Sequence, residues 1–519
     1  MSKPRVFHRR TFLKAAAGAG AAAVFGLGSF VRARAAEQGG KRINVLLFTA
    51  DDMNGDSVGA FGCDVPGTTP NLDRLAGQGM RLERAHVTIA VCQPCRNVLQ
   101  SGLYPHRNLG EGFHNVRKAD APTLLETLKA AGYRCGILGK VGHSTPKPGL
   151  EWHMSHDMNE LGRGRDPKTY GGFAREHILA ADQAGQPFFL MANSHDPHRP
   201  FAGSDQEKQS FKGYTPTAPS RWFKPDDVKV PGFLPDLPDV RLEIAEYYSS
   251  VRRCDDTVGE VLAAVEATGH ADDTFVLFLS DHGMALPFAK TNCYLHSTRT
   301  PCIARWPGAV KPGTVDRDHF VSGIDVFPTI LDACGLPVPD GLDGFSFVPV
   351  LRGGKQEGRD MVFTQFHETA GRNRYPMRAV HDGRFGYIFN AWSDGKRAFR
   401  NESQSGRTMK AMNEAAKEGS EIAARVNVFI HRTVEELYDF DADPDALVNL
   451  IGRPEHKTDA GRICKALEAW MVRTEDPALE AFRHRGDPQA LAAFMKEQAA
   501  RSARLRPPAK KKNRKTQAR

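Results

Sequence analysis

Residues 43–52 read INVLLFTADD, and the form of this stretch decides the fold class. A mostly apolar run, Ile43–Phe48, predicts a buried strand, and the chain passes from it directly into the carboxylates of Asp51 and Asp52. Three later runs have the same form: CGIL at 135–138 before Gly139-Lys140, FFLM at 188–191 before His195-Asp196, and TFVLFL at 274–279 before Asp281-His282. Each predicted strand therefore delivers charged or titratable groups at its carboxyl end.

Helical patterns lie between these runs, which predicts an α/β fold with a largely parallel sheet. Residues 122–131 (PTLLETLKAA) carry proline at an expected first turn and leucines at helical spacing, and 245–267 is a longer helical pattern. One strand ending in aspartate means little, because aspartate commonly opens turns. Four such endings together predict a site, because ligands of open α/β sheets bind outside the carboxyl ends of the strands.

The pattern changes near Arg352, which indicates more than one domain. We expect a catalytic domain over 41–355, a smaller subdomain over 356–485, and a basic tail over 486–519 that is helical or disordered. The proline-rich residues 197–240 are expected to form a surface excursion over the rim, and long loops of this kind often carry substrate specificity.

The amino terminus has the features of a targeting peptide. Residues 9–14 (RRTFLK) form a twin-arginine signature, and an Ala/Gly-rich apolar stretch follows from Ala15 to Val31. That stretch is shorter than the ~20 residues that a spanning helix needs, and residues 33–35 (ARA) offer a cleavage site. We expect a twin-arginine signal peptide over 1–35, export through the Tat machinery to the periplasm or the medium, and no integral membrane segment in the mature form. The alternative is an uncleaved membrane anchor.

The net charge of +9 describes the two ends of the chain rather than its body. Residues 1–36 carry seven Lys/Arg and residues 501–519 carry nine, without any acid, so the remainder has a net charge of −7. This distribution argues against a nucleic-acid-binding body. The nine cysteines are too sparse for a disulfide scaffold, and we expect most of them to be small core residues.

The sharpest local motif is CQPCR at 92–96, which continues to Ser101-Gly102. As a Cys-x-x-Cys pair, Cys92 and Cys95 would form a redox couple or half of a zinc site. A zinc site would need a second ligand pair at matching spacing, and the sequence offers none that is evident.

The same motif resembles the signature of the sulfatase family, in which the cysteine is oxidised to formylglycine; Ser101 stands where threonine is usual. The resemblance extends over nearly the whole mature chain. Asp51-Asp52 and Asp281-His282 match the two metal-binding pairs of the family, and Gly139-Lys140 with His143 matches its lysine–histidine element. Lys290 matches a later sulfate-binding lysine, and further family landmarks are matched by residues 325–337, 340–351 and 436–450. Within the family, HDPHR at 195–199, residues 227–235, KTN at 290–292 and YPMR at 375–378 are most similar to the heparan N-sulfatase branch.

The resemblance implies an alkaline-phosphatase-like α/β fold, with a mixed, largely parallel sheet flanked by helices and a smaller C-terminal α+β subdomain. It also implies a maturation enzyme that converts Cys92 to formylglycine, and a site for Ca²⁺ or Mg²⁺ made by Asp51, Asp52, Cys92, Asp281 and His282. Two departures concern this site. His282 stands where many sulfatases have asparagine, and Lys140 and His143 are separated by one residue more than in the commonest pattern.

The chemistry of the family explains these residue types. Hydrated formylglycine is a geminal diol: one hydroxyl attacks sulfur, and the second then expels sulfate as the aldehyde re-forms. The resemblance implies that Arg96 orients the diol, that Lys140 and Lys290 stabilise the sulfate oxygens, and that His143 supports the nucleophile or the sulfate. His195 is the candidate general acid for the leaving group.

The function that we expect is release of sulfate from a sulfated amino sugar, with N-sulfoglucosamine of heparin-like glycans as the favoured substrate. An O-sulfatase acting on a sugar sulfate ester would use every one of the same core residues. A phosphonate or phosphodiester hydrolase of the same superfamily is a third expectation. From a different class, the chain could be a non-catalytic glycan-binding relative, although such a protein has no need of the nucleophile, the carboxylates and both lysines together.

Overall fold

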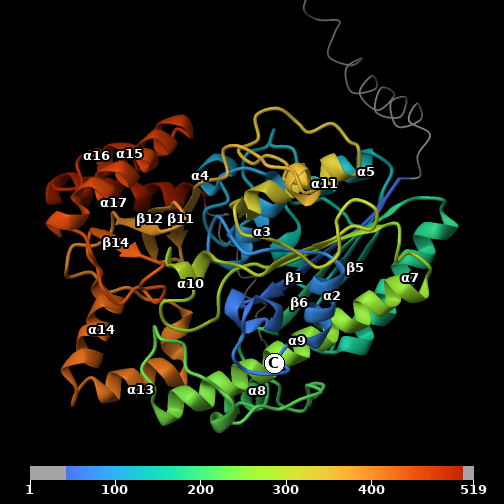
Figure 1. Cartoon of the computed structure of the whole chain (residues 1–519), viewed down its shortest axis with the longest axis horizontal. Helices are drawn as coiled ribbons and strands as arrows, with labels where there is room; N and C mark the ends of the chain where they lie inside the picture. Colours follow the sequence, from blue (N-terminus) through green and yellow to red (C-terminus); the bar gives the residue numbers. More distant parts are fainter. Residues whose placement is uncertain (1–41, 506–519) are drawn as a thin grey trace, which may run out of the picture.

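A computed structural model describes residues 42–505 of the chain (Figure 1). The expected signal peptide at 1–35 and the last part of the expected basic tail, 506–519, lie outside the described residues. Within residues 42–505, no helix has both the length and the apolar character that a bilayer crossing requires.

The centre of the molecule is an eight-stranded sheet with the order β5-β4-β6-β1-β7-β8-β2-β9. Its strands are β1 (Asn44–Asp51), β2 (Met80–Leu82), β4 (Arg134–Leu138), β5 (Met154–His156), β6 (Phe188–Pro197), β7 (Thr274–Ser280), β8 (Cys302–Arg305) and β9 (Thr314–Asp316). Strand β1 pairs in parallel with β6 and β7, and β4 pairs in parallel with β5 and β6, whereas β8 runs antiparallel to β7 and β2. The sheet is therefore mixed and largely parallel, which confirms the predicted fold class.

Alternate side chains of β1 face two different layers of helices, as the twofold period of a strand requires. Leu46 and Phe48 pack in one apolar cluster with residues of α7 (Pro167–Gln183) and α9 (Pro238–Ala267). Val45 and Leu47 pack in the other with residues of α5 (Leu124–Ala130) and α11 (Val326–Ala333). Figure 1 shows α7 and α9 together along one face of the sheet and α5 and α11 on the other.

The predicted helices are present with shifted ends. The helix expected at 122–131 begins two residues later, because the Thr123 side chain caps it by accepting a hydrogen bond from the Glu126 amide. The helix expected at 245–267 begins at Pro238, so it includes the end of the expected proline-rich excursion. Pro197, at the start of that excursion, ends β6, and the remainder contains only α8 (Asp205–Ser210) and the short 3₁₀ turn η3 (Pro225–Asp227).

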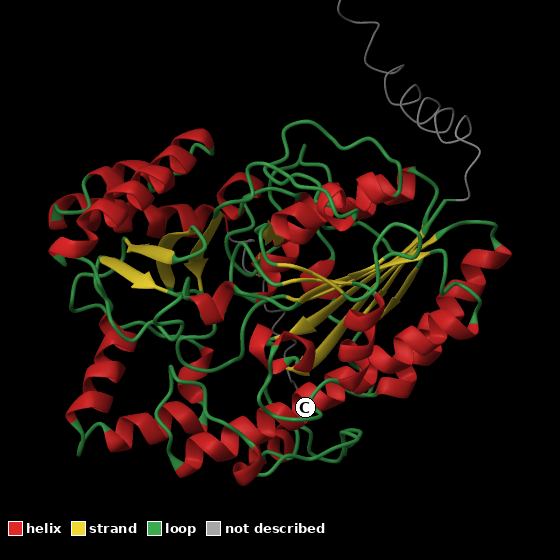
Figure 2. Cartoon of the chain, viewed as in Figure 1, coloured by secondary structure: helices red, strands yellow, loops and turns green. Residues whose placement is uncertain are grey.

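A second sheet follows the central sheet in the sequence and lies apart from it (Figure 2). It is antiparallel, with β11 (Val362–Glu368), β12 (Arg374–His381), β13 (Phe385–Asn390) and β14 (Glu435–Asp439) in that order. The helices of this region are α13 (Arg407–Ala415), α14 (Ser420–His431), α15 (Lys457–Arg473), α16 (Leu479–Arg483) and α17 (Pro488–Leu505). Helix α17, which falls in the segment expected to be a basic tail, buries Leu491, Phe494 and Met495 and contacts β12.

Short elements complete the fold. A two-stranded parallel pair joins β3 (Ala85–His86) to β10 (Val321–Ser322). The remaining helices are α2 (Pro70–Gln78), α3 (Cys92–Ser101), α4 (Pro105–Asn108), α6 (Val141–Ser144), α10 (Leu295–Thr298) and α12 (Val348–Leu351), with 3₁₀ turns η1 (Gly55–Ser57), η2 (Gly59–Phe61), η4 (Gly323–Asp325), η5 (Glu402–Ser405) and η6 (Pro454–His456).

Candidate active site

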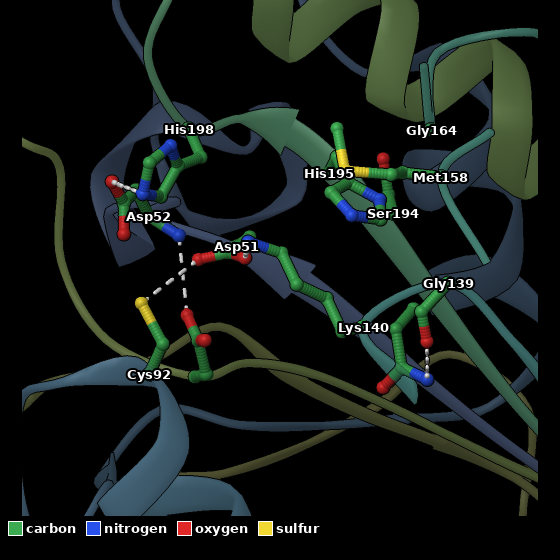
Figure 3. Close-up of polar contacts among 12 residues, drawn as sticks. Asp51, Asp52, Cys92, Gly139, Lys140, Met158, Gly164, Ser194, His195 and His198 are labelled. Atoms are coloured by element: carbon green, nitrogen blue, oxygen red, sulfur yellow. Dashed lines mark hydrogen bonds and ion pairs between the residues drawn. The ribbon is translucent and has the colours of Figure 1, made fainter. Parts of the chain in front are cut away.

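Cys92 is the first residue of α3, and its side chain is buried at the carboxyl ends of the central strands. The Cys92 Sγ lies 3.4 Å from Asp51 Oδ1 (Figure 3). It also lies 3.3 Å from His282 Nε2. Burial raises the pKa of the Cys92 thiol well above its usual value, and the nearby carboxylate of Asp51 acts in the same direction. The unmodified side chain is therefore a neutral thiol and not an activated thiolate.

The geometry does not favour a redox or zinc function for the Cys-x-x-Cys pair. All nine cysteines lie within the described residues and are free, and burial raises the pKa of Cys95 as it does that of Cys92. Reactive redox cysteines have a lowered pKa, which is the opposite direction. The potential metal ligands that gather around Cys92 are Asp51, Asp52 and His282, and Cys95 is not in this group.

The register of the sheet brings the two predicted acidic pairs together. Strands β1 and β7 pair in parallel with Ala50 opposite Ser280, so the residues that follow each strand emerge side by side. Asp52 adopts a left-handed backbone conformation with φ 70°, and its amide donates a hydrogen bond of 3.1 Å to Asp281 Oδ1. The other carboxylate oxygen of Asp281 accepts a hydrogen bond of 2.9 Å from Arg96.

His282 presents an unprotonated nitrogen to these acids. Its Nδ1 donates to the carbonyl oxygen of Gly283 at 3.0 Å, and burial lowers the pKa of the ring, so the neutral ring keeps a lone pair on Nε2. This Nε2 lies 3.3 Å from Asp52 Oδ1 and 3.6 Å from Asp281 Oδ1. A lone pair and carboxylate oxygens at these distances repel one another unless a positive charge lies between them.

These residues fit a divalent cation. One ligand atom from each of Asp51, Asp52, Cys92 and His282 lies within 4.8 Å of all the others, and all four residues are buried. Asp52 Oδ1 is buried and accepts no hydrogen bond from the described part of the chain. Burial, together with the neighbouring Asp51, raises the pKa of Asp52 well above its usual range, although Lys290 opposes this. A carboxyl that would be protonated here without further positive charge is the expected signature of a metal ligand. Asp281, also a predicted ligand, lies beside this group.

Three side-chain cations, those of Arg96, Lys140 and Lys290, face four carboxylates in the site. The carboxylates are those of Asp51, Asp52, Asp281 and Glu402. Lys140 follows β4 in a left-handed conformation with φ 50°, and its Nζ forms an ion pair with Asp51. Burial alone would lower the pKa of Lys290, but Asp52 and Glu402, each 2.8 Å from its Nζ, raise it well above its usual value. With all four carboxylates ionised, these residues leave one negative charge in excess, which favours a bound cation.

Arg96 connects three strands of the sheet. Its guanidinium is fully buried and donates hydrogen bonds to Thr49 Oγ1 at 2.7 Å, to Asn193 Oδ1 at 2.6 Å and to Asp281 Oδ2 at 2.9 Å. Thr49 and Asn193 lie in β1 and β6, and Asp281 follows β7. Arg96 is one turn after Cys92 in α3, so these hydrogen bonds of its forked guanidinium group, here called the Arg96 fork, fix the start of the helix against the sheet.

A cavity of about 490 Å³ opens over Cys92. This volume is within the ~300–1,000 Å³ range of small-molecule sites. From the catalytic part of the chain it is lined by Val91, Cys92, Phe113, His143, His198, Lys290 and Thr291, and from the C-terminal region by Thr369, Ala370, Gly371, Asn373, Arg400, Asn401 and Glu402. The site is therefore built by both parts of the fold.

Comparison with known proteins agrees with this geometry. The family model described as Sulfatase matches residues 43–336. The chain belongs to the sulfatase family. A second model, described as N-sulphoglucosamine sulphohydrolase, C-terminal, matches residues 281–400 of this sulfatase. It is accordingly a hydrolase of sulfuric esters or sulfamates.

Individual relatives are consistent with the family. The sulfatase is 30% identical to human (Homo sapiens) N-sulphoglucosamine sulphohydrolase over 84% of this chain and 91% of the relative. It is 26% identical to an ulvan-active sulfatase of Formosa agariphila, over 83% of this chain and 80% of the relative. The phosphonate monoester hydrolase of Agrobacterium radiobacter shares the fold, with a TM-score of 0.62 at 20% identity over 83% of this chain and 96% of that one.

The structure places His198, and not the predicted general acid His195, in the cavity of the sulfatase. His195 lies within β6, which extends to Pro197 because its pairing with β1 continues to Asp51. Its ring lies 3.4 Å from the Tyr170 hydroxyl and packs against Gly164. Among the described residues that line the cavity, His195 is absent and His198 is present. Figure 3 shows His198 above Asp52 and His195 directed away from Cys92.

His143 lines the cavity, despite the extra residue after Lys140. The four-residue helix α6 (Val141–Ser144) accommodates that residue. Burial and the charge of Lys140 lower the pKa of His143 to about 4, so the ring is neutral at physiological pH.

Glu402 was not predicted from the sequence. It begins η5 in the C-terminal region, and its side chain is one-third exposed, at 33%, to the cavity. Burial would raise its pKa, but Lys290 and His198 lower it well below its usual value, so Glu402 is ionised. The Asn401 side chain donates to Thr291 Oγ1 at 2.6 Å and so ties this turn to the loop of Lys290. No local motif marks residues 401–405, because only tertiary packing brings them to the site.

Proposed function

We propose that this sulfatase releases sulfate from a sulfated amino sugar, with the N-sulfate of a terminal N-sulfoglucosamine in heparan-type glycans as its preferred target. Two findings support this substrate: the 30% identity to the human enzyme over most of both chains, and the C-terminal family model that bears its name. The observation on which the proposal rests is the cavity in which Cys92, Lys290, His198 and Glu402 face one another.

The catalytic residues have separate roles in this proposal. Formylglycine formed from Cys92 would supply a diol hydroxyl to attack sulfur, and a divalent cation held by Asp51, Asp52, His282 and Asp281 would lower the pKa of that hydroxyl. Arg96 positions α3, and hence the nucleophile, through its contacts with Asn193 and Asp281. Lys140 and Lys290 stabilise the negative charge on the sulfate oxygens, and neutral His143 accepts a hydrogen bond at the nucleophile or the sulfate.

A sulfamate differs from a sulfate ester by the N–H group at its bridging atom, and the cavity contains two acceptors for it. The His198 Nδ1 donates to the Arg199 carbonyl oxygen at 2.5 Å, and burial and Lys290 lower the pKa of the ring to about 3, so Nε2 is an acceptor. This Nε2 lies 3.7 Å from Glu402 Oε1, with no proton to share between them. We propose that both accept from the substrate N–H before the reaction. The proton that the diol hydroxyl loses as it attacks sulfur then passes through His198 Nε2 to the bridging nitrogen as the S–N bond breaks, so the leaving group departs as a neutral amine that donates a hydrogen bond to Glu402.

His198 replaces His195 in this proposal. The role proposed for His195 from the sequence required contact with the leaving group, and His195 is instead packed against Tyr170 and Gly164. Its position in β6 supports a role in holding the strand end rather than in proton transfer.

Sulfate release by matured protein from N-sulfoglucosamine and from 6-O-sulfated N-acetylglucosamine tests the substrate, with Cys92→Ala as the blank. Faster release from the N-sulfated sugar is expected. Faster release from the ester would make the protein an O-sulfatase with the same core residues. Release from neither, with turnover of a phosphonate diester, would make it a phosphonate hydrolase. Binding without any turnover would identify a non-catalytic glycan-binding relative.

Maturation, metal and export are proposed together with the activity. We propose that a formylglycine-generating enzyme modifies Cys92 and that the cation is Ca²⁺, because carboxylate oxygens dominate the ligand set, with Mg²⁺ as the alternative. Mass spectrometry of the tryptic peptide that contains Cys92 tests the modification, and an unmodified thiol in fully active protein would refute it. We also propose that residues 1–35 direct Tat export to the periplasm or the medium. Cell fractionation with Arg9→Lys and Arg10→Lys tests this.

A further inference from the structure

A second cavity, of about 520 Å³, adjoins the catalytic one on the C-terminal side. The two share Asn373 and Arg400 as lining residues, so an extended ligand can pass from one into the other. The further residues that line the second cavity are Arg372, Arg374, Tyr375, Arg397, Ala398, Met495, Ala499 and Ser502. They come from the β11–β12 turn, the start of β12, the segment after β13 and the helix α17.

This second cavity is strongly basic. Four arginines line it (Arg372, Arg374, Arg397 and Arg400), and no carboxylate is found among the described residues of its lining. Arg374 is engaged by Glu111 and Gln498. The side chains of Arg397 and Arg400 are exposed to solvent. They are therefore positioned to meet an anionic ligand rather than to hold the fold together.

A third cavity, of about 810 Å³, continues the same path. It shares Arg397, Met495 and Ala499 with the second cavity and adds the exposed Lys496 of α17. Arg485 also lines it and forms an ion pair with Glu435 at 2.7 Å. Asp394 is the one acid among its described lining residues, and its carboxylate accepts hydrogen bonds from the amides of residues 396 and 397.

The basic character of this path is local. Outside its two terminal segments the chain has a net charge of −7, so the body as a whole repels anions. The exposed cations Arg400, Arg397 and Lys496, which begin at the catalytic cavity and end on α17, therefore have a specific place on an otherwise acidic protein. Asn373 adds a polar side chain at the junction of the first two cavities.

We propose that the second and third cavities, here called the arginine track, bind the anionic sugar residues that follow the residue whose sulfate is removed. The track rests on the proposed function, because it is continuous with the catalytic cavity. Arg400 and Arg397 contact sulfate or carboxylate groups of the next residues, and Lys496 contacts a group further along. The preferred substrate is therefore an anionic oligosaccharide and not a free monosaccharide.

Binding to the Cys92→Ala protein tests the track without turnover. The probe is a fluorescently labelled heparan-type tetrasaccharide with an N-sulfated non-reducing end. The variant Arg397→Gln/Lys496→Gln, in that background, is expected to bind it about tenfold more weakly, as loss of two partly exposed charge contacts implies. The control Lys168→Gln/Arg175→Gln removes the same charge from exposed positions of α7, on the other side of the molecule, and is expected to bind like the parent protein (Figure 1).

Two further measurements complete the test. In matured protein with Cys92 intact, the track variant is expected to raise KM about tenfold for the tetrasaccharide while kcat is retained. Equal binding losses in track and control variants, or none in either, would overturn the track. So would an oligothymidylate of the same charge that binds as tightly as the tetrasaccharide, because the track would then be a general polyanion surface. If matured protein releases no sulfate from any N-sulfated sugar, the proposed function fails, but the binding comparison still decides the track.

Discussion

Replacement of Glu402 by glutamine should separate N-sulfate from O-sulfate hydrolysis. Glu402 Oε2 lies 2.8 Å from Lys290 Nζ, and Glu402 Oε1 lies 3.7 Å from His198 Nε2. The substitution keeps the size of the side chain but removes its charge and replaces one acceptor oxygen with an NH₂ donor. A hydrogen bond to a charged group contributes about 1.5–3 kcal/mol. Since about 1.4 kcal/mol corresponds to a tenfold change in rate, kcat/KM for N-sulfoglucosamine should fall roughly 10- to 100-fold.

A sugar O-sulfate has oxygen at the atom that bridges to sulfur, so it offers Glu402 no N–H at that position, and its kcat/KM should change by less than about threefold. Sulfate release from both substrates, measured on the same matured preparation, gives the ratio directly. Glu414→Gln is the matched control, because Glu414 is an exposed glutamate that also pairs with a lysine, Lys417, at 2.7 Å. An equal loss of kcat/KM for the two substrates would show that Glu402 only positions Lys290. It would refute the proposal that Glu402 accepts a hydrogen bond from the sulfamate N–H.

Four further outcomes are expected. Arg96→Lys should lower Tm and reduce sulfate release at least about 100-fold, because lysine cannot replace the buried fork. His198→Ala should lower kcat/KM for the N-sulfated sugar by at least about tenfold, whereas His195→Ala should act mainly on Tm. Chelation should abolish sulfate release and lower Tm, and added Ca²⁺ should restore both; unchanged Tm would argue against a resident cation. Burial raises the pKa of Asp255 to about 7, so the native state retains a proton that the unfolded chain releases above about pH 4. Stability should therefore fall as pH rises from about 4 through 7, and Asp255→Asn should flatten this part of the Tm profile.

The sheet and its rim were predictable because they follow from local patterns. Apolar runs bounded by acids locate β1 and β7, and the parallel pairing that such runs favour brings Asp52 and Asp281 together without further information. The end of β6 was less predictable. Its polar residues Asn193 to Asp196 look like a loop, yet they continue the strand because β1 supplies partners as far as Pro197. That extension turns His195 away from the cavity and leaves the turn that follows to place His198.

Glu402 and Arg400 escaped prediction for a different reason. They lie more than 100 residues from Lys290 in sequence, in a segment without repeat or motif, and reach the cavity only because the C-terminal sheet packs beside the central one. Tertiary contacts of this kind leave no periodic trace in the sequence, so pattern analysis identifies the chemistry of the rim but not the residues that close over it.

The difference between the rim of the central sheet and the C-terminal residues that close over it has a functional consequence. The residues proposed to carry out sulfur chemistry are held by strand ends and by the Arg96 fork, where a shift of one residue would break several buried contacts at once. Apart from His198, the residues proposed to contact the leaving group and the rest of the glycan lie on η5, on the segment between β13 and η5, and on α17, where most side chains are exposed or partly exposed. Substitutions there cost little stability, because few buried contacts are lost. The C-terminal part can therefore change the substrate while the nucleophile, its carboxylates and its lysines stay in place, and variants of Glu402 and Arg397 should alter specificity before they alter folding.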